Sequence, residues 1–270
     1  MRRRRSADGL GTPAVLVPPA VIGVLFLFVP TLSILIRAPW SSLGTIYRHN
    51  DVAAALRLSI LTSLQSLVLS LVFGVPLAWV LARMRFPGLG VLRAIVTIPL
   101  VLPPVVGGVA LFLALGRFGV VGRYLYSWFG LTLPFTQHGV VLAETFVAMP
   151  FLVVTVEGAF RTADRALEEA AATLGANRTR TFSRVTLPLI VPSLVAGSVL
   201  CWARALGEFG ATVLFGGAVT GRTQTMPTLV LYAFQHEPED AVALSLPLML
   251  VALIVLGALR DKWLRPAASA

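Results

Sequence analysis

Two oppositely charged side chains lie inside a long apolar run of this sequence. Arg204 and Glu208 are four residues apart within residues 189–215. Residues at this spacing lie on one face of a helix and can form an ion pair. Inserting a charged side chain at the centre of a bilayer costs roughly 2.5–3.5 kcal/mol, which makes such residues candidates for function. The pair can neutralise itself within the lipid or line a polar pathway. These interpretations are compatible, and we expect a pathway.

Small residues accompany the pair. Gly207 and Gly210 allow a neighbouring helix to approach closely, so a pathway beside them would be narrow and able to change shape. Arg204 supplies positive charge, and broken helices can present backbone N–H groups to an anion. The residues alone therefore indicate a pathway for an anion without specifying which one.

The composition places these residues in a membrane protein. Hydrophobic residues make up 57% of the 270 positions and charged residues only 13%, whereas globular chains carry roughly a quarter charged residues. Only helices and closed barrels satisfy their backbone hydrogen bonds in lipid. The apolar runs are continuous and about twice as long as the roughly ten-residue strands of a barrel. We therefore predict an all-α membrane protein.

Six apolar runs approach the roughly 20 residues that a spanning helix needs. In the third run, proline and glycine pairs are expected to break the helix. No internal repeat or second domain is visible, so residues 1–270 are predicted to form one transmembrane domain. The six runs cover residues 15–36, 58–82, 94–116, 139–160, 189–215 and 241–259, and the expected breaks are at Pro103, Pro104, Gly107 and Gly108.

The arginine and lysine residues indicate how the chain is oriented. With the N-terminus inside, fifteen of them fall on the cytoplasmic side, including Arg2 to Arg5 and Arg265, and six fall outside. Because basic residues favour cytoplasmic segments, both termini are expected in the cytoplasm, and the first run is expected to be a retained membrane segment. The net charge of +10 is thus explained by topology, and no nucleic-acid partner is expected.

The sequence offers no residues for catalysis or for metal binding. His49, His138 and His236 are scattered, and the single cysteine, Cys201, lies in an apolar run. A phosphate-binding loop ends in Gly-Lys followed by Ser or Thr, but the only lysine, Lys262, lies between Asp and Trp. We expect no metal site, no bound cofactor and no ATP binding by this chain.

The longest predicted cytoplasmic segment joins the fourth and fifth runs. Thr162 or Asp164 can cap a short helix, and residues 167–174 place small apolar side chains on one face of it. Gly175 is suited to end that helix, because glycine adopts the left-handed conformation at little cost. Pro188 suits the first turn of the next span.

This segment resembles the EAA loop of bacterial ABC importer permeases. Glu169-Ala170-Ala171, three residues, Gly175, nine residues and then V-T-L-P reproduce the spacing of that loop. In the family the loop is a coupling helix seated in a cleft of a separate cytoplasmic ATPase subunit. The resemblance therefore implies the type I importer architecture, and it gives the ATPase-coupling role to Glu169, Ala170, Ala171, Gly175, Leu187 and Pro188.

A narrower resemblance is to molybdate and sulfate permeases. Residues 204–211 look like the fifth span of that group, residues 98–108 like its third span, and residues 221–227 like its molybdate branch. The resemblance implies import of molybdate or tungstate by alternating access, with sulfate or thiosulfate as the alternative. It also implies a homodimer in the bacterial cytoplasmic membrane, together with ATPase subunits and an extracytoplasmic oxyanion-binding protein that selects the ligand.

Two other classes of function remain open. An autonomous secondary transporter would use Glu144, Glu157 or Glu208 for ion coupling, and inverted repeats with matching broken helices would favour it, but none is visible. Because Glu144 and Glu157 lie near the ends of their run, we expect them to make interfacial or interhelical bonds. A membrane scaffold for an ATPase is the other alternative, and the intramembrane Arg204–Glu208 pair argues against it.

Overall fold

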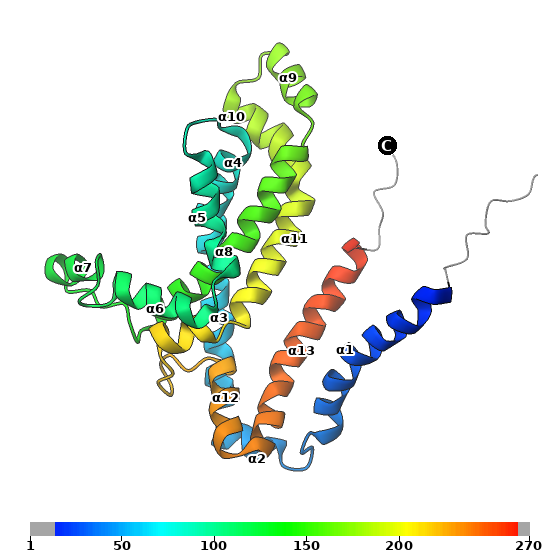
Figure 1. The fold of residues 1–270 in the computed structure, drawn as a ribbon, viewed down its shortest axis with the longest axis vertical. Helices are drawn as coiled ribbons and strands as arrows, with labels where there is room; N and C mark the ends of the chain where they lie inside the picture. The colour runs from blue at the N-terminus through cyan, green and yellow to red at the C-terminus, as the bar shows by residue number, and fades with distance from the viewer. Residues whose placement is uncertain (1–13, 264–270) are drawn as a thin grey trace, which may run out of the picture. The chain divides into compact units, whose positions relative to one another are not determined.

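The computed structural model describes residues 14–263, which form helices and turns without a strand (Figure 1). The chain divides into two compact units, Met1–Tyr47 with Ala233–Ala270, and Arg48–Tyr232. Arg2 to Arg5 and Arg265, on which part of the orientation argument rests, lie outside the described residues.

The smaller unit contains two long apolar helices. The 3₁₀ turn η1 (Ala14–Leu16) leads into α1 (Val17–Arg37), which buries no residue and contacts α13 (Pro238–Trp263). The short helix α2 (Leu43–His49) is tied to α13 because the Tyr47 hydroxyl donates to the carbonyl of Ala243 at 3.0 Å. Burial raises the pKa of Tyr47, so its phenol stays protonated and keeps this hydrogen bond at neutral pH.

The larger unit is a helical bundle in which three π-helical turns interrupt or follow longer helices. The turn η2 continues α3 into α4, and η3 continues α10 into α11, so each set forms one long apolar helix. The elements are α3 (Val52–Leu69), η2 (Ser70–Gly74), α4 (Val75–Arg83), α5 (Leu89–Val101), α6 (Pro104–Leu115), α7 (Gly122–Phe129), α8 (Gln137–Thr162), α9 (Arg165–Thr173), α10 (Arg178–Thr181), η3 (Phe182–Thr186), α11 (Leu187–Leu206), η4 (Thr212–Gly216) and the start of α12 (Met226–His236).

Among the described residues, five helices are long and apolar enough to cross a membrane, and each overlaps one predicted run. The third run, predicted over 94–116, is not a single helix: α5 and α6 are short and separate. The chain is extended at Leu102 and Pro103, since a residue before proline is pushed out of the helical region and proline has no N–H to donate. The five long helices are Val17–Arg37, Val52–Arg83, Gln137–Thr162, Arg178–Leu206 and Pro238–Gly257.

The core of the larger unit is built around α8, which packs against α3, α4 and α11 (Figure 1). Close approach of α11 to α8 depends on Gly197, because a Cβ there would lie 3.2 Å from the side chain of Thr155 and 3.3 Å from that of Leu152. Leu152 is itself fully buried. Small residues at a helix interface bring backbones together and gain packing contacts in lipid.

Replacing Gly197 with leucine is therefore expected to separate α11 from α8. Overpacking of a close contact costs about 1–3 kcal/mol, and we expect a clear fall in the melting temperature of the detergent-purified protein, measured by fluorescence-detected size exclusion after heating. Gly158→Leu is the matched control, because no atom lies within 4 Å of a Cβ at that position on α8. Equal melting temperatures of the two variants would contradict the packing role.

Candidate functional site

The predicted cytoplasmic segment forms a capped helix, α9. The carboxylate of Asp164 accepts a hydrogen bond from the backbone N–H of Ala166 at 2.9 Å and caps the helix. Thr162, the alternative cap, instead donates to the carbonyl of Gly158 at the end of α8. Beyond the helix, Gly175 has a φ of +81°, the left-handed conformation expected of the residue that stops it.

One side of α9 is open to a partner. Glu169 and Ala170 are exposed and Ala171 is partly exposed, while Leu174 is 88% exposed. No residue of α9 is buried. The predicted docking residues therefore lie on a surface that the described part of this chain leaves uncovered.

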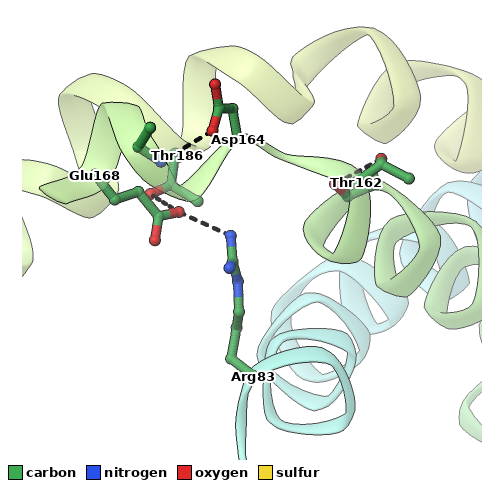
Figure 2. A network of polar contacts seen from close by, with 7 residues as sticks. Arg83, Thr162, Asp164, Glu168 and Thr186 are labelled. Carbon is green, nitrogen blue, oxygen red and sulfur yellow. Dashed lines mark hydrogen bonds and ion pairs between the residues drawn. The ribbon is translucent and has the colours of Figure 1, made fainter.

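A polar network that the sequence did not indicate holds the other side of α9. One carboxylate oxygen of Glu168 accepts a hydrogen bond from the Arg83 guanidinium at 2.8 Å and another from the Thr186 hydroxyl at 2.9 Å. Figure 2 shows Glu168 between these two side chains, which come from α4 and η3. The sequence separations of 85 and 18 residues explain why no local pattern revealed the network.

The basic turn after α9 leads directly into the next long helix. Asn177 caps α10 by accepting from the N–H of Arg180 at 2.9 Å. The π turn η3 then passes without a break into α11, which starts at Leu187 with Pro188 in its first turn, as predicted. Leu187 and Pro188 therefore lie at the junction of η3 and α11, inside the long helix Arg178–Leu206.

The Arg204–Glu208 pair forms, but its setting differs from the prediction. The guanidinium and carboxylate approach to 2.5 Å, and the Glu208 side chain is 1% exposed. The continuous helix expected over 189–215 is wrong, because α11 ends at Leu206 and Gly207 follows as its cap. Glu208 lies beyond the helix end, where its other oxygen accepts from the N–H of Ala211 at 2.9 Å. The Glu208 carboxylate thus accepts from a backbone N–H that would bond to a carbonyl oxygen in a continuous helix.

Two groups of predicted residues meet across this break. A Cβ on Gly108 would lie 3.0 Å from the Cα of Ala211, and one on Gly210 would lie 3.0 Å from the Cβ of Pro104. The α6 helix therefore touches the segment that follows Gly207, and both contacts require glycine. Gly107 and Gly108 lie inside α6 and Pro104 is its first residue, so of the four predicted break residues only Pro103 lies in the break, together with Leu102.

The side of α3 that faces the bundle interior is polar. The hydroxyl of Thr62 donates to Glu144 of α8 at 2.9 Å, and the indole N–H of Trp202 donates to Ser63 at 2.9 Å. Glu144 is buried, and this interhelical bond is of the kind expected for it. We call this side the polar stripe. Its members are all buried and follow one another at helical spacing, the last of them in η2: Ser59, Thr62, Ser63, Ser66 and Ser70.

Glu157 also bonds between helices. It pairs with Arg93 of α5 at 3.0 Å and with Arg161, one turn along α8, at 2.7 Å. Arg93 in turn donates to the carbonyl of Leu81 on α4 at 3.1 Å. Glu157 thus fastens α4, α5 and α8 to each other, in agreement with the expected interhelical role.

Comparison with known proteins identifies the family of this chain. Residues 71–269 match the family described as "Binding-protein-dependent transport system inner membrane component". The chain belongs to this family. Its five long apolar helices agree with a multi-pass membrane protein, and the chain is a transport permease and not an enzyme.

Individual relatives agree with this assignment. The permease is 48% identical over 240 residues to the molybdenum transport system permease protein ModB of Mycobacterium bovis, covering 88% of this chain and 90% of that protein. It is 35% identical over 266 residues to the sulfate transport system permease protein CysW of Synechococcus elongatus, covering 95% and 93%. A chain in the crystal structure of a bacterial alginate ABC transporter, bound to its alginate-carrying periplasmic protein, shares the fold with a TM-score of 0.72 at 20% identity, covering 90% of each chain.

Proposed function

We propose that this permease carries molybdate or tungstate across the bacterial cytoplasmic membrane, powered by separate ATPase subunits. The observation that carries the ATP-driven part is α9, a capped helix whose Glu169 and Ala170 are exposed at the junction between two long apolar helices. Molybdate rather than sulfate is supported by the higher identity to the molybdenum permease, 48% against 35%.

The proposed assembly is a homodimer with both termini in the cytoplasm. Each of two ATPase subunits binds α9 of one permease copy. An extracytoplasmic binding protein delivers the oxyanion to the opposite face of the membrane. Closure of the ATPase subunits displaces α9, and the bundle alternates between outward-open and inward-open forms. The oxyanion passes beside the guanidinium of Arg204. Gly207, Gly210 and the α6 contact let this region change shape.

Uptake by the reconstituted transporter tests the function. Vesicles that contain the permease with its ATPase and binding protein should accumulate radiolabelled molybdate only when ATP is present on the ATPase side. A 100-fold excess of tungstate should compete, and the same excess of sulfate should not. Uptake without the ATPase would identify a secondary carrier, and equal competition by sulfate would overturn the substrate assignment.

The docking role of α9 is tested at two residues. Glu169→Lys reverses an exposed charge, and Gly175→Leu forces a side chain into a left-handed residue, which costs about 1–2 kcal/mol and disturbs the end of α9. Both variants should reach the membrane normally but lose at least tenfold in ATP-dependent uptake, with less ATPase retained in pull-downs. Gly90→Leu is the control, since a Cβ at Gly90 would have no atom within 4 Å and the φ of this residue is not positive. Unchanged uptake in both variants would refute docking at α9.

The pathway role of the ion pair needs variants that keep the fold. Arg204→Leu with Glu208→Leu removes both charges together, so neither is left unpaired in the membrane. Arg204→Gln with Glu208→Gln also removes them but retains an oxygen for the N–H of Ala211. Both double variants should insert and show markedly reduced molybdate uptake. Full uptake by the glutamine pair would assign Arg204 and Glu208 to structure alone.

A further inference from the structure

The two adjacent glutamates of α9 have different surroundings. Glu169 is exposed, whereas Glu168 is partly buried and accepts hydrogen bonds from Arg83 and Thr186 on the same oxygen. Successive residues on a helix point about 100° apart, because one turn takes 3.6 residues. Glu168 therefore points toward the transmembrane helices of its own chain, as Figure 2 shows. Glu169, the next residue, is exposed on another side of α9.

The partners of Glu168 lie on two long apolar helices, Val52–Arg83 and Arg178–Leu206. Arg83 is the last residue of α4, and Thr186 is the last residue of η3, immediately before α11. A single carboxylate thus joins α9 to the end of the helix Val52–Arg83 and to the π turn η3 inside the helix Arg178–Leu206. The peptide chain alone connects α9 to α8 on one side and, through α10, to the helix that contains η3 and α11 on the other, but it gives no direct connection to α4.

Burial makes this contact stronger than an ordinary surface ion pair. The side chain of Arg83 is 9% exposed and that of Glu168 is 25% exposed, while Thr186 is buried. Exposed pairs contribute little because water and salt screen them, but removing one partner of a buried pair leaves an uncompensated charge. Without the Glu168 carboxylate, the positive charge of Arg83 would be buried and unpaired, which is energetically unfavourable.

Apolar packing does not replace this connection. No residue of α9 is buried, so burial of apolar surface contributes little to holding α9 in place. The links on either side of α9, residues 163–164 and 174–177, are short and non-helical. A displacement of α9 would be absorbed by these links unless a specific contact carried it further.

We propose that Glu168 is a positioning residue that transmits the movement of α9 to α4 and α11 through Arg83 and Thr186. This inference rests on the proposed ATP-driven function. Glu169 and the alanines receive the ATPase, and Glu168 passes the displacement to the two helices. Loss of Glu168 should then separate ATP hydrolysis from transport, whereas loss of docking should abolish both the assembly and its stimulated hydrolysis.

A charge exchange tests the proposal. Glu168→Arg and Arg83→Glu should each lower the amount of molybdate taken up per ATP hydrolysed by tenfold or more, while the ATPase remains bound. The double variant Arg83→Glu with Glu168→Arg restores an ion pair and should recover at least half of the wild-type ratio. Arg85→Glu is the matched control, because Arg85 is exposed two residues further along the chain, and it should keep the wild-type ratio.

A structural readout separates this proposal from the proposed function. Spin labels at the exposed residues Met84 and Leu174, in a Cys201→Ala background, should give a narrow distance distribution with Glu168 and a broader one with Glu168→Gln. If the wild type shows no ATP-dependent uptake, the proposed function fails. If the wild type transports but Glu168→Gln keeps both its transport-to-hydrolysis ratio and the narrow distribution, the role of Glu168 is refuted and the function stands.

Discussion

Polar groups inside a membrane protein must find partners within the protein, because the hydrocarbon around it supplies none. The buried or half-buried carboxylates of the larger unit illustrate this requirement. Glu144 accepts from Thr62, Glu208 pairs with Arg204, Glu157 pairs with Arg93 and Arg161, and Glu168 pairs with Arg83. Three of these four carboxylates bond to a side chain on a different helix, so the need for partners also fixes how α3, α4, α5, α8 and α9 are arranged.

These contacts divide the unit into regions with different consequences for movement. Glu157 and its two arginines lock α4, α5 and α8 together. The region after α11 is instead held by one capping carboxylate, Glu208, and by glycine contacts to α6. Backbones that touch through glycine can slide or tilt against each other, which suits the change of shape proposed for this region.

The sequence predicted those features that depend on local patterns. Long apolar runs indicated all five long helices of the described residues. The cap at Asp164 and the end of α9 at Gly175 followed from residue type and spacing. The break at Gly207 was missed, because an apolar run with a four-residue ion pair looks the same whether or not its helix continues. The partnership of Glu168 with Arg83 was also missed, since 85 residues separate them and only the packed bundle brings them together.

The π turns determine how one part of a long helix is rotated relative to the next. A π turn accommodates an additional residue in a helical turn, and one residue corresponds to about 100° of rotation about the helix axis. The turn η2 lies between the polar stripe of α3 and Arg83 at the end of α4. It therefore sets the angular phase between an inner surface that meets Glu144 and a terminal guanidinium that meets Glu168. A regular α-helix would need one residue fewer between α3 and α4 to keep the polar stripe and Arg83 at the same relative angle about the helix axis.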